Sequence, residues 1–145
     1  MIEILKMDET HVSAIAEIEK LCFSDPWSEN SISGELNSRL SYWLVAMEDG
    51  ALLGYIGSQS VLGESDMMNV AVHPDHRRRG IAQALILQLM QDLKARDNVN
   101  LSLEVRASNV PAITLYEKLG FEVAGRRPNY YRHPKEDALI MKKAL

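Results

Sequence analysis

The order of the apolar patterns along this 145-residue chain limits its possible folds more than any other feature of the sequence. Residues 42–47 and 51–61 are aromatic and β-branched runs, and the Asp49-Gly50 pair between them is typical of a two-residue hairpin turn. Beyond this hairpin the pattern predicts a strand, an amphipathic helix and an alternating strand, at 65–72, 80–94 and 100–105. Because an antiparallel hairpin precedes a strand–helix–strand unit, we expect a mixed α/β sheet and not a doubly wound parallel one.

Weaker patterns on both sides of this central part complete the expected element order. Asp8 is a good N-cap for a helix that ends near Cys22, and Asn109 can cap another that ends before Gly120, a residue suited to a left-handed C-cap. The remaining expected elements are a strand at 2–4, a short helix over 32–40, and strands at 121–123 and 138–141. The order β-α-α-β-β-β-α-β-α-β-β gives about seven strands, mostly antiparallel, and about four helices. The length predicts one domain over residues 1–145.

Charge is divided unevenly between the two halves of the chain. The sequence has 16 basic and 20 acidic residues, and the formal charge of −4 argues against a general nucleic-acid-binding surface. Residues 1–70 hold 12 acids and 3 bases, a net charge of −9, whereas residues 71–145 hold 8 acids and 13 bases, a net charge of +5. We therefore expect one half to attract a cation and the other to attract an anion.

Several classes of protein are excluded by the side chains that the sequence contains. Cys22 is the only cysteine, which excludes an intramolecular disulfide framework and a thiolate zinc cluster, and we interpret it as structural. The four histidines have no carboxylate at a usual metal-ligand spacing, so no metal is expected. No apolar run reaches the ~18 residues of a membrane span, and the first residues lack a signal-peptide pattern. These features predict a soluble, cytoplasmic protein with no membrane partner.

The segment Arg77-Arg78-Arg79-Gly80-Ile81-Ala82 lies between a predicted strand and the clearest predicted helix. Unpaired backbone N–H groups at a helix start carry the positive end of the helix dipole and can bind an anion. Gly80 and Ala82 lack bulk, so an anionic group could approach the backbone, and the three arginines add positive charge. The alternative is a solvated basic turn that happens to precede a helix. The strand–loop–helix context favours a pyrophosphate-binding turn.

This segment resembles the R/Q-x-x-G-x-G/A signature of the GNAT N-acetyltransferases, with Ala82 where many relatives have glycine. Similarity to one branch, the bacterial ribosomal-protein-alanine N-acetyltransferases, extends over nearly the whole chain. The segments that carry it are Phe23-x-x-Pro26-Trp27-Ser28, Leu103-Glu104-Val105-Arg106-Ala107-Ser108-Asn109, Leu115-Tyr116-Glu117-Lys118-Leu119-Gly120-Phe121 and Asn129-Tyr130-Tyr131. The loop signature alone marks the superfamily, whereas these segments together are much more specific. The resemblance implies a GNAT-like fold.

For the co-substrate, the resemblance implies acetyl-CoA, with its pyrophosphate on the 78–83 turn and its pantetheine arm along residues 70–72. Asn109 suits a helix N-cap on sequence grounds, and the matching asparagine of the family also contacts the cofactor. The implied cofactor-binding residues are Val70, Ala71, Val72, Arg77, Arg78, Arg79, Gly80, Ile81, Ala82, Gln83 and Asn109.

Glu104 lies on the polar side of the alternating strand, where a carboxylate is more often a solvent-facing residue than a catalytic one. The resemblance implies that it is the general base, acting through a water. A free α-amine, with a pKa near 7.7–8.0, is partly neutral at pH 7, whereas a lysine side chain, with a pKa of about 10.4, is far harder to deprotonate. A carboxylate with no extreme pKa could therefore serve an α-amine.

Tyr116 has two interpretations. A tyrosine on the apolar face of the predicted helix over 109–119 is usually a core residue with its hydroxyl at the rim. The resemblance implies that Tyr116 is the general acid that protonates the leaving CoA thiolate.

The segments from Phe23 to Ser28 and Tyr130-Tyr131 concern the acceptor. Each aromatic residue there could equally well pack a loop over the sheet, whereas the resemblance places these segments beside a peptide groove. The implied substrate-binding residues are Phe23, Pro26, Trp27, Tyr130 and Tyr131. From the acidic first half, with Glu136 and Asp137, we also hypothesise an acceptor peptide that begins with a small residue and continues basic.

The expected activity is acetyl transfer from acetyl-CoA to the N-terminal α-amine, by family resemblance alanine, of a small-subunit ribosomal protein. Direct attack in a ternary complex is expected because no nucleophile–base pair appears in the sequence. Alternatives are other protein N-termini, a lysine, a small amine such as a polyamine, or a non-catalytic acyl-CoA sensor, which would not need both Glu104 and Tyr116. A nucleic-acid role for Arg77–Arg79 is weaker, since one short cluster neutralises few phosphates.

Overall fold

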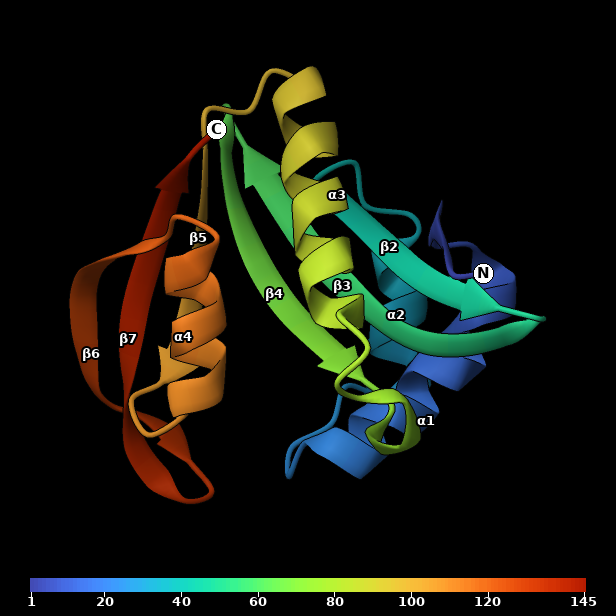
Figure 1. The fold of residues 1–145 in the computed structure, drawn as a ribbon, viewed down its shortest axis with the longest axis horizontal. Helices are drawn as coiled ribbons and strands as arrows, with labels where there is room; N and C mark the ends of the chain where they lie inside the picture. The colour runs from blue at the N-terminus through green and yellow to red at the C-terminus, as the bar shows by residue number, and fades with distance from the viewer.

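The computed structural model describes residues 1–145, which form one seven-stranded sheet with helices on both faces (Figure 1). The strands are β1 (Glu3–Lys6), β2 (Ser41–Glu48), β3 (Ala51–Val61), β4 (Glu64–Val72), β5 (Asn100–Arg106), β6 (Glu122–Arg132) and β7 (Lys135–Ala144). The helices are α1 (Val12–Cys22), α2 (Glu29–Glu35), α3 (Ile81–Ala95) and α4 (Val110–Lys118), with short 3-10 turns at Glu9–His11 and Pro74–His76. The strand order is β1-β2-β3-β4-β5-β7-β6, and only β4 and β5 are parallel neighbours. The predicted mixed, mostly antiparallel sheet with four helices is confirmed.

The predicted boundaries of three elements were wrong. The short helix predicted over 32–40 is α2, which ends at Glu35, because Gly34 and the polar residues after it are poor helix formers and the chain continues as turns. The strand predicted at 121–123 is β6, which extends to Arg132, and the one predicted at 138–141 is the longer β7. Most of β6 is exposed on both faces, so its sequence lacks the apolar alternation that identifies a strand.

The two helical layers each cover a separate part of the core. Helices α3 and α4 lie on the near face of the sheet in Figure 1, and α3 packs Leu85, Leu89 and Leu93 into the larger cluster. Helices α1 and α2 cover the other face with a second cluster that includes Ile15 and Ile18. Burial of these apolar stripes provides the main driving force for the arrangement.

Strands β4 and β5 separate after a short paired stretch, and this divergence shapes the middle of the molecule. They pair only where Glu64–Asp66 lie beside Asn100–Ser102. A register shift against β3 leaves Met68 as an extra residue in β4, and a bulge of this kind bends the strand. From there β4 curves away from β5 (Figure 1). The sheet therefore opens between its two halves.

Candidate active site

A cavity of about 510 Å³ lies where β4 and β5 diverge, on the face that carries α3 and α4. Nearly all the residues predicted to bind acetyl-CoA line it. These are Val70, Ala71, Val72, Arg77, Arg78, Gly80, Ile81, Ala82, Gln83 and Asn109. Tyr116, predicted as the general acid, and Phe23, predicted beside the acceptor, line the same cavity. The sequence prediction missed other lining residues, among them Cys22 and His76, because they lie at a helix end and in a turn without a motif of their own.

The turn before α3 has the backbone conformation of an anion-binding loop. Gly80 is the N-cap of α3 with φ of 73°, and Arg78 also has a positive φ, 65°. No side chain caps the helix, so its first N–H groups remain available to a ligand. A Cβ on Gly80 would meet no atom within 4 Å, so the left-handed φ, and not lack of space, is what favours glycine there.

The three arginines of this turn have different partners. Arg77 donates from Nε to the Val72 carbonyl at 3.3 Å, and its Nη2 lies 3.3 Å from the Cys22 sulfur. Arg79, predicted to bind the cofactor, does not line the cavity. Its Nη2 instead lies 3.0 Å from both carboxylate oxygens of Glu48, and this arginine holds the pKa of Glu48 below its usual range. Arg78 is therefore the arginine of the turn that lines the cavity with no protein partner for its side chain.

Asn109 and Tyr116 bring α4 to the cavity. The Asn109 side-chain oxygen accepts a hydrogen bond from the Ala112 N–H at 3.3 Å, which confirms the predicted helix cap and leaves the amide donors of Asn109 free for a ligand. Tyr116 is 7% exposed, and its ring lies 5.8 Å from that of Phe121. Burial, and then the nearby Tyr131, raise the pKa of Tyr116 to about 12. The Tyr116 hydroxyl thus keeps its proton at neutral pH.

Glu104 projects from the opposite face of β5. Its neighbours Leu103 and Val105 enter the core beneath α3 and α4, so the strand alternation directs Glu104 to the face that carries α1. The Glu104 side chain is 32% exposed, and its Oε2 lies 3.1 Å from Nε of Arg127. The sequence prediction missed Arg127 as a partner, because β6 was not recognised that far along the chain.

Two neighbouring tyrosines of β6, Tyr130 and Tyr131, lie close to Glu104, and Tyr131 also lies close to Tyr116. Burial, and then the Glu104 carboxylate, raise the pKa of Tyr130 and raise that of Tyr131 to about 12. Tyr131 also contributes to the raised pKa of Tyr116. The Tyr130 and Tyr131 rings meet edge to face at 5.1 Å. Tyr131 is therefore near both predicted catalytic side chains.

The loop between α1 and α2, residues 23–28, meets the β6–β7 turn across the opening. Ser24 donates from its hydroxyl to the His133 carbonyl at 3.1 Å, and the Trp27 ring lies 5.4 Å from that of Trp43. Pro26 lies in the same loop, and Ser28 caps α2 by accepting from the Ser31 N–H. Of the five residues predicted beside the acceptor, Phe23 lines the cavity, and Tyr130 and Tyr131 lie near Glu104. Trp27 instead packs its ring on Trp43 in the core cluster beneath α1 and α2.

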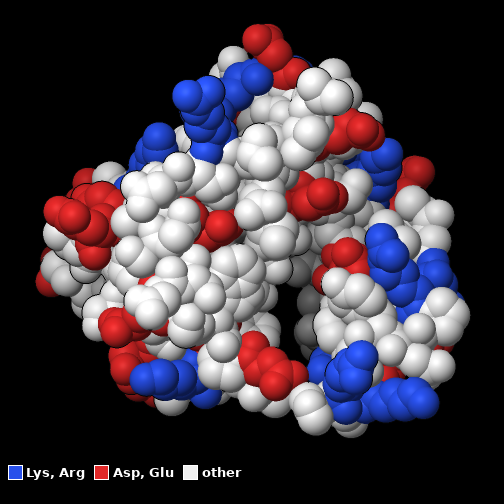
Figure 2. All heavy atoms as spheres, turned by 180° about the vertical axis from the view of Figure 1, so that it is seen from behind, with Lys and Arg blue, Asp and Glu red and all other residues white.

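Figure 2 shows the molecule from the α1–α2 side, with an opening between the two halves and acidic side chains at its edges. Glu136 and Asp137, which the acceptor hypothesis includes in the acidic charge, each have an arginine partner. Glu136 lies 3.3 Å from Arg106 and accepts from the Ser108 N–H at 2.6 Å. Asp137 lies 2.8 Å from Arg126. Because an arginine of the chain lies beside each of them, these two carboxylates add little net negative charge at the opening.

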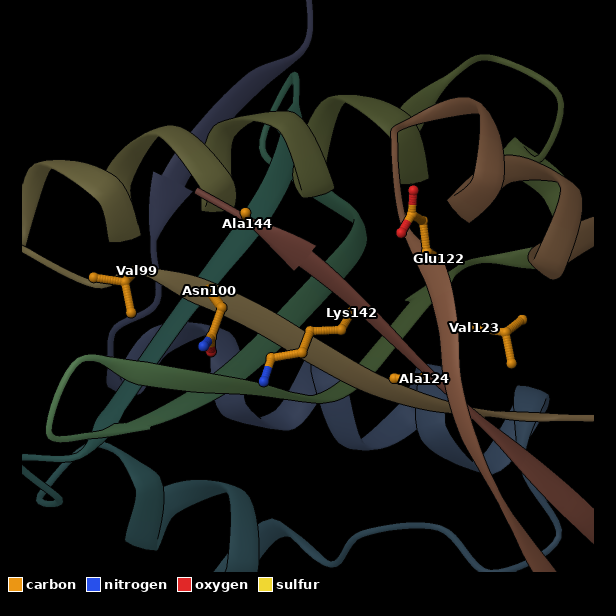
Figure 3. A pocket seen from close by; sticks show the side chains of 7 residues that line it. All are labelled: Val99, Asn100, Glu122, Val123, Ala124, Lys142 and Ala144. Atoms are coloured by element: carbon orange, nitrogen blue, oxygen red, sulfur yellow. The ribbon is translucent and has the colours of Figure 1, made fainter.

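A second hollow, of about 380 Å³, lies on the β5–β7–β6 part of the sheet, away from all of these residues (Figure 3). Val99, Val123 and Ala124 supply much of its lining, and the charged ends of Glu122 and Lys142 point in different directions. None of the predicted site residues lines it, so it offers no arrangement for the expected chemistry. The structure has no group of three His, Cys, Asp or Glu side chains placed to hold a metal ion. None of its helices has the length and apolar character needed to cross a membrane.

Comparison with known proteins is consistent with this geometry. Residues 12–121 match the acetyltransferase (GNAT) family. The [ribosomal protein bS18]-alanine N-acetyltransferase of Escherichia coli K12 is 39% identical over 141 residues, 95% of this chain and 94% of the relative. The enzyme of the same name from Salmonella typhimurium is 41% identical over 138 residues, 93% of this chain and 92% of the relative.

The same resemblance holds in three dimensions. The crystal structure of the Escherichia coli ribosomal-protein-S18-alanine N-acetyltransferase superposes with a TM-score of 0.92 at 36% identity, covering 99% of this chain and 94% of that one. The family match, the curated relatives and this superposition agree with the cavity and the turn before α3. The chain belongs to the GNAT family of acetyltransferases, which use acetyl-CoA as their co-substrate.

Proposed function

We propose that this chain transfers the acetyl group of acetyl-CoA to the N-terminal α-amine of a ribosomal protein, with alanine as the acceptor residue. The names of its relatives support this acceptor class. The observation that carries the proposal is the opening between β4 and β5, with the cavity and Tyr116 on one face and Glu104 on the other. Residues 1–145 act as one acetyltransferase domain, and the reaction takes place in the cytoplasm, where ribosomal proteins are made.

The residues around the cavity fit acetyl-CoA. The uncapped start of α3 and the Arg78 side chain suit a pyrophosphate, which carries negative charge. Along residues 70–72, β4 pairs with β3 on one side and has no strand partner on the other. Apart from the Val72 carbonyl, which accepts from Arg77, backbone groups on the open side of this stretch can hydrogen-bond the amides of an extended pantetheine arm. When bound, the thioester supplies the activated acetyl group.

The acceptor amine must be neutral to attack, and Glu104 removes its proton. The Glu104 carboxylate accepts the proton from the ammonium through a water molecule, as a general base. An α-ammonium has a pKa near 7.7–8.0, so its deprotonation at neutral pH costs little free energy. A lysine side chain has a pKa of about 10.4, so its deprotonation costs much more. A partly exposed carboxylate thus suits an N-terminus better than a side chain.

Tyr116 supplies the second proton transfer. As the new C–N bond forms and the C–S bond breaks, the sulfur leaves as a thiolate, and the Tyr116 hydroxyl donates its proton to it. Burial raises the pKa of Tyr116 to about 12, so the hydroxyl is protonated at neutral pH and can donate its proton to the leaving thiolate. The reaction proceeds by direct transfer in a ternary complex, without an acyl-enzyme.

A panel of peptides incubated with the protein and acetyl-CoA, with the modified position read by mass spectrometry, tests this function. The panel contains peptides that begin with alanine, serine and methionine, and one lysine peptide with a blocked N-terminus. We expect fastest acetylation of the alanine peptide at its α-amine. Comparable acetylation of the blocked lysine peptide would contradict the α-amine assignment, and binding of acetyl-CoA without any turnover would indicate a sensor.

A further inference from the structure

Glu19 of α1 has a buried carboxylate that the proposed proton transfers do not use. The residue is 1% exposed, and no other Asp, Glu, Lys or Arg is buried. Its Oε2 accepts hydrogen bonds from the Tyr55 hydroxyl and from Nδ2 of Asn69, the latter at 2.6 Å. Its Oε1 accepts from the backbone N–H of Trp27 at 2.8 Å. Glu19 therefore joins three separate segments of the chain.

The three partners account for an acidic residue at this position. All of them donate, and an ionised carboxylate is the side chain that only accepts. Burial raises the pKa of Glu19, and the hydrogen bonds from Trp27 and Asn69 oppose that rise. Burial of a carboxylate lowers the stability of the fold unless hydrogen bonds compensate it. Apolar side chains of similar volume in place of the buried charge and its partner often give equal stability. Stability alone is thus a weak reason for a charge here.

Two of the three segments that Glu19 joins, the 23–28 loop and β4, contribute residues to the lining of the cavity. Trp27 belongs to the irregular loop 23–28, and the Glu19 carboxylate accepts the hydrogen bond of its backbone N–H while its ring packs on Trp43. Asn69 follows the extra residue Met68 in β4 and directly precedes Val70, where the cavity lining begins. The Glu19 carboxylate therefore fixes the acceptor-side loop relative to the strand beside the cofactor cavity.

We propose that Glu19 is a positioning residue for the acceptor. Its carboxylate fixes the position of the 23–28 loop relative to β4, and an acceptor N-terminus that lies against this loop is thereby directed at the opening. This inference rests on the proposed function. It predicts that loss of the carboxylate weakens use of the acceptor more than use of acetyl-CoA, whose cavity is built by the turn before α3 and by residues 70–72.

Glu35 provides a matched control for a purely structural role. It also lies on an N-terminal helix, and its carboxylate accepts from Ser41, from Nε1 of Trp43 and from Gln59, at 3.0, 3.3 and 3.0 Å. These contacts join α2 to β2 and β3, and Glu35 does not line the cavity. If Glu19 acts only by stabilising the fold, Glu19→Gln and Glu35→Gln should have similar effects on activity.

The test compares steady-state kinetics of Glu19→Gln and Glu35→Gln with an alanine-initiated peptide and acetyl-CoA. A glutamine presents an NH2 group to at least one of the three donors, so one hydrogen bond of Glu19 is lost. We expect the acceptor KM to rise about tenfold in Glu19→Gln, as for one lost hydrogen bond to a charged group, with kcat and acetyl-CoA affinity within about twofold. Glu35→Gln should lower the melting temperature and leave the acceptor KM within about twofold. An unchanged acceptor KM in Glu19→Gln, or an equal rise in Glu35→Gln, overturns the proposal.

Two further measurements decide the proposal if Glu19→Gln does not fold or if the wild type acetylates no α-amine. If Glu19→Gln does not fold, Asn69→Ala and Tyr55→Phe each remove one donor and keep the carboxylate, and Asn69→Ala should raise the acceptor KM about threefold. No rise in either variant overturns the proposal. If the wild type acetylates no α-amine, the proposed function fails separately, and hydrogen exchange decides the inference. Faster exchange across residues 23–28 in Glu19→Gln but not in Glu35→Gln supports it, and equal exchange overturns it.

Discussion

The Nε atom of Arg127 lies 3.1 Å from Oε2 of Glu104, so the carboxylate proposed as general base is paired with a cation from β6, two strands away in the sheet. The arginine is about half exposed, and its guanidinium lies 5.8 Å from the centre of the Tyr130 ring. An acceptor ammonium that approaches Glu104 therefore meets a like charge beside it.

Removal of this cation should strengthen acceptor binding. In Arg127→Gln, the Glu104 carboxylate no longer shares its charge with a guanidinium, so the acceptor KM should fall about twofold to fivefold, the range expected for a partly exposed ion pair. Arg126→Gln is the matched control, because Arg126 lies one residue away and pairs with Asp137 instead. Steady-state kinetics with an alanine-initiated peptide measures both. A higher acceptor KM in Arg127→Gln, or the same fall in Arg126→Gln, would contradict this account.

The arginines of the turn before α3 should differ in their effect on acetyl-CoA. Arg78→Ala removes the cavity's free guanidinium and should raise the acetyl-CoA Kd about tenfold, whereas Arg79→Ala should change it less than about twofold. Arg78→Gly should lose the same affinity without loss of thermal stability, because glycine adopts the positive φ of this position freely. Calorimetric titration with acetyl-CoA checks all three variants. Equal losses in Arg78→Ala and Arg79→Ala would show that Arg78 has no special place in the site.

Stability should fall steeply in alkali. Tyr42, Tyr116 and Tyr131 have pKa values of about 12 in the folded chain, against about 10 when unfolded. Because the unfolded state releases these protons first, the free energy of unfolding decreases as pH rises from 10 to 12. The buried Tyr116 alone contributes up to about 1.4 kcal/mol per pH unit. Tyr116→Phe should flatten this dependence in thermal melts between pH 9 and 11, and an unchanged slope would mean that Tyr116 is not the buried acid described here.

Gly57 should tolerate no side chain. A Cβ at this position would lie within 2.6 Å of the Trp43 ring, which is itself buried and stacked on Tyr55 at 5.9 Å. Gly57→Ala should therefore lose about 1–3 kcal/mol of unfolding free energy through overpacking. Gly34→Ala, in α2 with nothing within 4 Å of the new Cβ, should gain about 0.5–1 kcal/mol. Denaturant titration compares the two, and a neutral Gly57→Ala would mean that Trp43 can move.

The parts of the site that the sequence predicts are those specified by neighbouring residues. The strand–turn–helix context of Gly80 and the strict alternation around Glu104 are local patterns, and the structure places both as expected. The ion pair of Arg127 with Glu104 and the contacts of Glu19 depend on residues far apart in the chain. Nothing in the sequence around Glu19 distinguishes it from the other polar residues of its helix, and only the contacts of Trp27 and Asn69 with its carboxylate do so. The same limit applies to Arg79, whose partner Glu48 lies 31 residues away.

The most direct test of the account is the turnover of Glu104→Gln on an alanine-initiated peptide, with acetyl-CoA affinity measured on the same sample. Glutamine keeps the size of the side chain and cannot accept the amine proton, so we expect turnover to fall about 100-fold or more, with a changed pH profile. The acetyl-CoA Kd should stay within about twofold, because Glu104 does not line the cavity. Turnover and a pH profile equal to those of the wild type would contradict the role of Glu104 as the base at the opening between β4 and β5.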